Sequence, residues 1–201
     1  MDPNGYLKVI DWGFAKEVTD NTTYTMCGTP EYLAPEIVNG SGHGKAADFW
    51  ALGVNIYEMA VGYTPFVGDD VDDKLAICQR ITSGAVEWPP QDEVAVDPAL
   101  MALVEALLAQ DPLQRLGCLK AGVRDVEGHA VYAENKGSGA EGPEETSRAA
   151  FDWSAMRRFE MPAPWVPDLS GGAKDVSNFD DIYDDEEEDI WPYDGDATFD
   201  F

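Results

Sequence analysis

The spacing of hydrophobic residues predicts a helical centre for this chain. Residues 46–59 carry apolar side chains on every face of a helix, a distribution typical of a helix that is buried on all sides. Residues 71–84 show an amphipathic pattern instead, so we expect a more exposed helix there. Its inward-facing residues should be Leu75, Ile77, Cys78 and Ile81.

Another helix is predicted from Pro98 to Gln110, because proline suits the first turn of a helix. Asp111-Pro112 ends this pattern, and a shorter helix is expected over residues 123–128. The apolar stripe of the helix that begins at Pro98 consists of Leu100, Leu103, Val104, Leu107 and Leu108. Residues 34–132 are therefore predicted to form a mostly helical, locally connected body.

The segments before and after this body show other patterns. Residues 6–10 alternate and are rich in β-forming side chains, which predicts a short strand that runs into Asp11. Residues 19–33 are polar and loop-like. Residues 134–149 have the low apolar content of a flexible linker.

Residues 162–201 combine proline and acidic residues with spaced aromatic residues. A segment of this composition cannot build its own core, so we expect a tail that wraps another surface and inserts aromatic side chains into pockets. A merely disordered acidic tail is the alternative. The aromatic residues include Trp165, Phe179, Tyr183, Trp191, Tyr193, Phe199 and Phe201.

Charge narrows the classes of partner. The chain has 39 acidic and 13 basic residues, and its net charge is −26. Nucleic acid is disfavoured as a partner because phosphate contacts require Lys and Arg, whereas basic peptides would be attracted. Part of the charge has another explanation, a solvated tail, because residues 175–201 contain many acids and no Lys or Arg.

Compartment signals are few. The sequence has no run of 18 apolar residues, so no membrane span is expected, and its first residues show no secretory signal. Its three cysteines lack the spacing of metal ligands and fit reduced thiols. A cytoplasmic location is therefore expected.

Several motifs point to one family. Asp11-Trp12-Gly13 is followed by a hydroxyl-rich segment and a proline-anchored helix start, an order that resembles the activation segment of a protein kinase. The further matches are Cys-Gly-Thr-Pro-Glu-Tyr-Leu-Ala-Pro-Glu-Ile-Val at 27–38, Ala-Asp-Phe-Trp-Ala-Leu-Gly-Val at 47–54 and Ser-Asn-Phe-Asp-Asp at 177–181. Together they resemble the C-terminal lobe and tail of an AGC-group Ser/Thr protein kinase of the cyclic-nucleotide-dependent type.

The resemblance implies catalytic and regulatory roles in the first part of the chain. Asp11 would hold Mg²⁺ between the phosphates of ATP; the alternative for an isolated Asp-x-Gly is a simple turn. Thr29 would lie beside the catalytic aspartate. Thr25 would be phosphorylated, with Lys16 as one cation that receives the phosphate; the alternative is an unmodified hydroxyl in a turn.

It also implies residues that bind substrate and nucleotide. Glu31 and Glu58 would recognise basic residues of a peptide through charge-assisted hydrogen bonds, and the alternative for Glu58 is an ordinary charge on a helix surface. Leu33, with residues 27–29, would form a small apolar pocket for the residue after the phosphoacceptor. Phe179 would reach the adenine pocket.

Three residues would have structural rather than catalytic roles. Glu36 and Arg115 would form a buried ion pair, for which a bidentate Arg–carboxylate geometry is well suited. Asp48 lies on the central apolar helix, where an unpaired charge is costly. The backbone groups that pair with it in the family belong to a catalytic loop that this sequence does not contain, so we expect Asp48 to be exposed to water or otherwise paired.

The resemblance implies a mainly α fold: a kinase C-terminal lobe with short β-strands at its N-terminal end, plus an extended acidic tail. The domains would be a partial kinase domain over 1–132, a flexible insertion over 133–150 and a tail over 151–201. Lys45-Ala46 and Met59-Ala60 resemble cAMP-dependent kinases, whereas the Asp-Phe ending resembles cGMP-dependent ones. Both types stay open.

Two functions are compatible with these residues. The sequence contains no Gly-x-Gly-x-x-Gly at a strand end, no Val-Ala-x-Lys and no His-Arg-Asp, all of which phosphoryl transfer would need. The first hypothesis is therefore a Ser/Thr kinase that uses ATP and Mg²⁺, here a catalytically incomplete fragment. Its partners would be basic peptide substrates, the kinase N-terminal lobe and a cyclic-nucleotide-binding regulatory domain or subunit. The second is a non-catalytic module that binds basic peptides or a kinase docking surface.

Overall fold

A computed structural model describes residues 1–18, 22–68, 73–133, 149–169, 171–172 and 177–178. The chain divides into two compact units. One unit is Ile10–Glu160, and the other combines Met1–Val9 with Met161–Phe201. Each is described by itself below.

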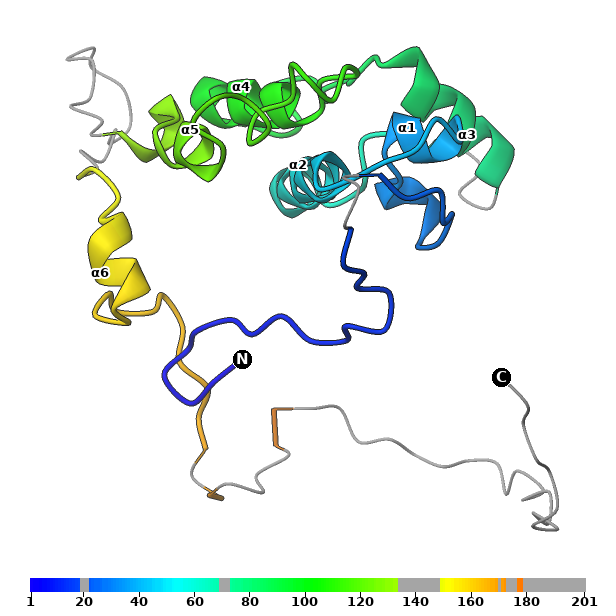
Figure 1. Cartoon of the computed structure of the whole chain (residues 1–201). Helices are drawn as coiled ribbons and strands as arrows, with labels where there is room; N and C mark the ends of the chain where they lie inside the picture. The colour runs from blue at the N-terminus through cyan, green and yellow to red at the C-terminus, as the bar shows by residue number, and fades with distance from the viewer. Residues whose placement is uncertain (19–21, 69–72, 134–148, 170, 173–176, 179–201) are drawn as a thin grey trace, which may run out of the picture. The chain divides into compact units, whose positions relative to one another are not determined.

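The Ile10–Glu160 unit is mainly helical (Figure 1). The helices predicted over 46–59, 71–84, 98–110 and 123–128 are present, with ends that differ from the prediction by a few residues. In chain order the helices are η1 (Pro30–Tyr32), α1 (Pro35–Val38), α2 (Ala46–Val61), α3 (Lys74–Ser83), α4 (Pro98–Leu107), α5 (Val123–Glu127), η2 (Ala130–Tyr132) and α6 (Trp153–Arg157). No helix in the described residues is long and apolar enough to cross a membrane.

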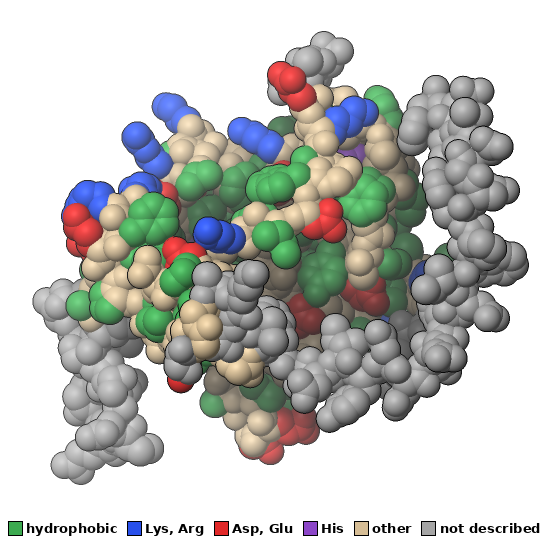
Figure 2. Space-filling view, turned by 90° about the horizontal axis from the view of Figure 1, so that it is seen from below, with side chains coloured by type: hydrophobic (Ala, Val, Ile, Leu, Met, Phe, Trp, Pro, Cys, Tyr) green, Lys and Arg blue, Asp and Glu red, His purple; other side chains and the backbone are tan. Residues whose placement is uncertain are grey.

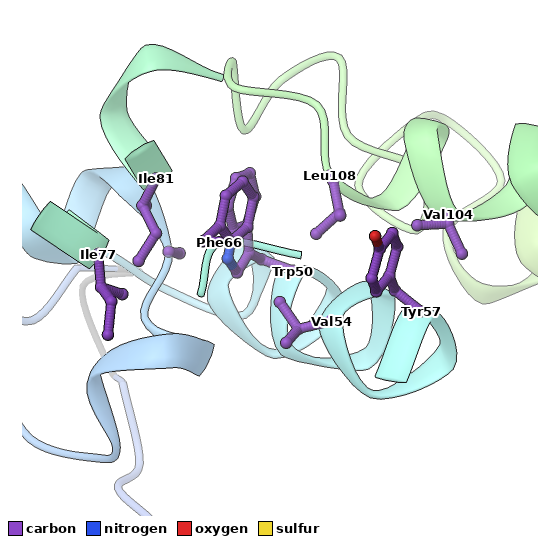
Figure 3. Close-up of a cluster of buried hydrophobic side chains, with 9 residues drawn as sticks. Trp50, Val54, Tyr57, Phe66, Ile77, Ile81, Val104 and Leu108 are labelled. Carbon is purple, nitrogen blue, oxygen red and sulfur yellow. The ribbon is translucent and has the colours of Figure 1, made fainter. Parts of the chain in front are cut away.

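Helix α2 supplies the centre of the main core (Figure 3). The Trp50 ring stacks on Phe66 with centroids 5.5 Å apart, and Val54 and Tyr57 are also buried. Gly53 lets α4 approach closely, because a Cβ there would lie 2.9 Å from the Leu107 Cβ. Ile77 and Ile81 of α3 and Val104 and Leu108 at the end of α4 complete the cluster.

The expectation that α2 is buried on every face is wrong. Leu52 is 40% exposed and Met59 is 78% exposed, because the packed residues Trp50, Val54 and Tyr57 follow the i, i+4, i+7 spacing of one helix face. Leu75 is likewise 70% exposed rather than inward-facing. Helix α3 packs through Ile77 and Ile81, and a residue two positions from Ile77 points to the opposite side of a helix.

The ends of α3 and α4 follow local sequence signals. Asp73 caps α3 by accepting a hydrogen bond from the Ala76 N–H, and Asp97 caps α4 by accepting one from the Ala99 N–H. Gly84 closes α3 in the left-handed conformation that glycine adopts without strain. Helix α4 ends at Leu107, three residues earlier than predicted, because Leu108 leaves helical geometry at ψ 24°.

The predicted strand over residues 6–10 is not present. The described residues contain no β-strand, only an isolated antiparallel bridge between Thr23 and His43. Leu7, Val9 and Ile10 are exposed. A strand is stabilised by a ladder of backbone hydrogen bonds to a neighbouring strand. The only bridge in the described part of the chain lies outside residues 6–10, so the β-forming side chains alone do not produce a strand.

The second unit contains a turn at its N-terminal end. Asp2 Oδ1 accepts hydrogen bonds from the N–H groups of Asn4 and Tyr6. The Tyr6 hydroxyl donates to the Met161 carbonyl at 2.6 Å, and Gly5 lies so close to the Trp165 carbonyl that a Cβ would clash with it. This turn therefore packs on the proline-rich segment that begins at Met161. The predicted linker over 134–149 falls mostly, and the tail aromatics from Phe179 onward entirely, outside the described residues.

A buried ion pair joins distant parts of the Ile10–Glu160 unit. Arg115 is fully buried, and its guanidinium donates to both carboxylate oxygens of Glu36, at 2.7 and 2.9 Å. It also donates to the carbonyls of Ala46 (2.8 Å) and Ala109 (3.0 Å). The Trp50 ring lies against it, 5.1 Å from centroid to Cζ. The ion pair predicted from the resemblance is thus present.

We expect Glu36→Ala to lower the free energy of unfolding by about 3–5 kcal/mol, because Arg115 would stay buried without its counter-charge. Urea unfolding followed by circular dichroism measures this change. Glu160→Ala is a matched control, because it removes the carboxylate of the exposed pair Arg158–Glu160 and should leave the unfolding midpoint unchanged. Equal midpoints for the two variants would contradict the importance of the buried pair.

Candidate functional site

Asp11 and its neighbours are exposed. The Asp11 backbone has a φ of 60°, a left-handed conformation that aspartate tolerates better than most residues. Its Oδ1 accepts a hydrogen bond from the Gly13 N–H at 3.3 Å. Trp12 and Phe14 are also exposed. The Asp11 carboxylate therefore lies in a tight turn at the surface, open to further ligands.

Mg²⁺ is commonly held by one or two carboxylates together with phosphate oxygens and water. The described residues contain no cluster of three or more metal-binding side chains. A single exposed carboxylate such as Asp11 fits one protein ligand of a magnesium–nucleotide complex. It does not form a metal site by itself.

A lysine and two threonines form a hydroxyl-rich cluster. The Lys16 Nζ donates to the Thr23 Oγ1 at 3.1 Å, and the Thr23 and Thr25 hydroxyl oxygens lie 3.4 Å apart. The Thr23 backbone exchanges two hydrogen bonds of 2.8 Å with His43. Lys16 thus lies near Thr25, as the resemblance implies, but its direct contact is with Thr23. We call Lys16, Thr23 and Thr25 the Lys16 cluster.

The segment after this cluster leads into the core. Thr29 precedes η1 and its side chain makes no capping hydrogen bond. Leu33 is buried, and a Cβ at Gly28 would lie 3.6 Å from the Leu33 Cδ2. Gly28 and Leu33 are therefore neighbours, and the apolar pocket of residues 27–29 with Leu33 stays a prediction.

Tyr32 links the two acidic residues that sequence analysis assigned to peptide recognition. Its hydroxyl donates to the Glu58 Oε2 at 2.5 Å. This hydrogen bond, with burial and the charges of Glu58 and Glu31, raises the pKa of Tyr32 to about 12. The Glu31 Oε2 is buried and has no hydrogen-bond partner in the described part of the chain. The charges of Glu31 and Glu58 thus both act on one tyrosine.

The sequence alone predicts no role for Tyr32 or Thr23. Thr23 and Thr25 are two residues apart in an extended segment, so their side chains share a face, and this spacing was a usable signal. The Tyr32–Glu58 contact joins residues 26 positions apart, and no local pattern predicts it. Asp48, in the first turn of α2, is exposed, which is one of the two outcomes expected for it.

Large apolar side chains are exposed on the Ile10–Glu160 unit. Figure 2 shows hydrophobic side chains at the surface between separate positive and negative ones. Of the described residues in the Ile10–Glu160 unit, those with exposed large hydrophobic side chains include Tyr24, Met26, Met59, Tyr63 and Leu75.

The raised pKa of Tyr32 gives a testable prediction. Because the fold favours the neutral phenol, its stabilising contribution is complete below pH 10 and is lost as the pH rises through about 12. Subtracting the tyrosinate absorbance titration of Tyr32→Phe from that of the unchanged chain should reveal one group with a pKa of about 12. Glu58→Gln should lower this pKa towards 10. Tyr24→Phe, which removes an exposed phenol, should leave the high-pH step in place. A difference titration centred at pH 10 would contradict the prediction.

Comparisons with known proteins agree with the motifs. The family described as protein kinase domain matches residues 1–125. The chain is 38% identical over 187 residues to a cAMP-dependent protein kinase catalytic subunit of Dictyostelium discoideum. It is 39% identical over 181 residues to catalytic subunit 3 of Drosophila melanogaster, and 37% identical over 179 residues to catalytic subunit PRKX of Homo sapiens.

These alignments cover most of this chain but only part of each relative. They include 93%, 90% and 89% of this chain, and 25%, 27% and 43% of the Dictyostelium, Drosophila and human proteins. The chain thus spans less than half the length of the relatives it matches. Since the family match extends over more than half of the 201 residues, the chain belongs to the protein kinase family.

Proposed function

We propose that this chain supplies the activation segment and substrate-binding lobe of a serine/threonine protein kinase, which transfers the γ-phosphate of ATP to basic peptides. The observation that carries the proposal is the Glu36–Arg115 pair, which fixes the end of the segment from Asp11 to Glu36 against the helical body. Residues 1–132 would be the partial kinase domain, 133–150 an insertion and 151–201 the tail.

Within this function, the residues near Asp11 serve the nucleotide and its regulation. When bound, ATP would supply the phosphoryl group, and Mg²⁺ would offset the negative charge of its phosphates. Asp11 offers the oxygen ligand that Mg²⁺ prefers, and Thr29 would lie beside the catalytic aspartate. Phe179, which is outside the described residues, would reach the adenine pocket. A phosphate on Thr25 would attract Lys16 and order the segment between them.

The acidic residues beside Tyr32 provide the substrate preference. Tyr32 holds the Glu58 carboxylate by a hydrogen bond, and Glu31 adds a second negative charge near the same tyrosine, so both favour an arginine-containing peptide. Leu33 supports an apolar contact for the residue after the phosphoacceptor. Because the relatives above are named cAMP-dependent, we favour that type, with the kinase N-terminal lobe and a cyclic-nucleotide-binding regulatory domain or subunit as partners.

The transfer activity is testable in two proteins. The purified 201-residue chain should show no ATP-dependent phosphate transfer to an arginine-rich peptide, because it has no lysine motif or His-Arg-Asp motif. The longest protein encoded by the transcript should transfer phosphate to this peptide. Asp11→Asn in that protein should reduce the rate by ~10²–10³-fold or more, as loss of one electrostatic stabilising group does. Radiolabelled phosphate incorporation measures both. A transcript product without activity would favour the alternative, a non-catalytic binding module.

Peptide recognition has its own prediction. Glu58→Gln should weaken binding of an arginine-rich peptide to the chain by ~10–100-fold, the loss expected for one charge-assisted hydrogen bond. Tyr32→Phe keeps the Glu58 charge and should weaken binding less. Glu93→Gln removes one negative charge from an exposed acidic residue elsewhere on the chain and should have little effect. Isothermal titration calorimetry distinguishes these cases. Equal losses for Glu58→Gln and Glu93→Gln would show that only net charge matters.

A further inference from the structure

Within the Lys16 cluster, the Lys16 ammonium contacts Thr23, a threonine to which the proposed function gives no role. The Lys16 Nζ lies 3.1 Å from the Thr23 Oγ1. The contact that the described residues show for the Thr25 hydroxyl is with the Thr23 hydroxyl, at 3.4 Å between the two oxygens. Both hydrogen bonds lie at the exposed surface, so the Thr23 hydroxyl is accessible to an enzyme. The cation that would hold a phosphate is therefore already positioned at Thr23.

The backbone around Thr23 is also held in place. Its N–H and C=O both bond to His43 at 2.8 Å, and a Cβ at Gly42 would lie 2.6 Å from the Thr22 side chain. A side chain fixed in this way loses less conformational freedom when it gains a charged partner. Thr25, by contrast, is exposed and makes no such backbone hydrogen bond to another described residue.

We propose that Thr23 is a second phosphate-accepting residue of the activation segment and that its phosphate is held by Lys16. The proposal rests on the proposed function and adds a regulatory site to it. The donor is ATP and the catalyst is a serine/threonine protein kinase that acts on this chain. A bond forms between Thr23 Oγ1 and the γ-phosphorus, the bond from that phosphorus to the β,γ-bridging oxygen breaks, ADP leaves, and the hydroxyl proton passes to the kinase and then to water.

The two threonines compete for this cation. A phosphothreonine carries about −1.5 to −2 charges, and two phosphates on hydroxyls 3.4 Å apart would repel each other strongly. The chain already carries a net charge of −26. Phosphate on Thr23 and phosphate on Thr25 are therefore alternatives, and loss of one hydroxyl favours modification of the other.

The physical part of the proposal is tested with phosphothreonine incorporated genetically at position 23. The modified chain should melt about 2–4 °C above the unmodified chain, the shift that a typical charge-assisted contact produces in a domain of this size. Lys16→Gln should abolish the rise, whereas Lys120→Gln, an exposed lysine elsewhere, should preserve it. An unchanged or lower melting temperature, or a rise that persists in Lys16→Gln, would overturn the proposal.

The modification itself is tested by mass spectrometry on the chain and its Thr25→Ala variant produced in eukaryotic cells. Phosphate on Thr23, enriched in Thr25→Ala, is the expected result, and no phosphate on Thr23 in either protein would overturn the proposal. Neither measurement depends on catalysis by this chain. If kinase activity is absent but phosphate on Thr23 still raises the melting temperature, the proposed kinase function fails and the proposal for Thr23 stands.

Discussion

The arrangement of the helical unit depends on one buried cation. Burying the Arg115 guanidinium removes it from water, a cost that is offset only when its donors and charge are satisfied together. Those partners come from α1, from the start of α2 and from the segment that follows α4: the Glu36 carboxylate and the carbonyls of Ala46 and Ala109. Three segments must therefore be correctly placed at once. This requirement fixes where the segment from Asp11 to Glu36 meets the core.

The two ends of that segment differ in how firmly they are held. At its C-terminal end, Leu33, Ala34 and Glu36 are buried. At its N-terminal end, Trp12 and Phe14 are exposed, and among the described residues the Asp11 side chain bonds only to the nearby Gly13 N–H. Regions with few buried contacts open at lower free energy than core regions. The order of the segment can thus respond to charge placed along it, while its anchor at Glu36 stays unchanged.

Sequence patterns predicted the helices well because each helix carries its own signals. Pro98 after Asp97 marks the start of α4, and the apolar spacing of Trp50, Val54 and Tyr57 marks α2. The early end of α4 escaped prediction because the apolar spacing continues to Leu108, whose backbone has already left helical geometry at ψ 24°. The strand over 6–10 was wrong because pairing depends on a neighbour that side-chain alternation does not reveal. Of the candidate site, the resemblance supplied Glu36–Arg115, whereas the contacts of Tyr32 and Thr23 needed the folded geometry.

The distinction between attraction and selection bears on the proposed substrate. A net charge of −26 attracts any cation, but it does not distinguish arginine from lysine. Selection requires fixed acceptors. Tyr32 orients the Glu58 carboxylate through one oxygen, Oε2, before a partner arrives, and the neighbouring Glu31 Oε2 is already desolvated without a donor in the described chain. A planar guanidinium offers several donors in fixed directions, so it gains more from an oriented carboxylate such as that of Glu58 than an ammonium does. Under the proposed function, overall charge sets how fast a basic peptide arrives, and the two glutamates beside Tyr32 determine which one stays.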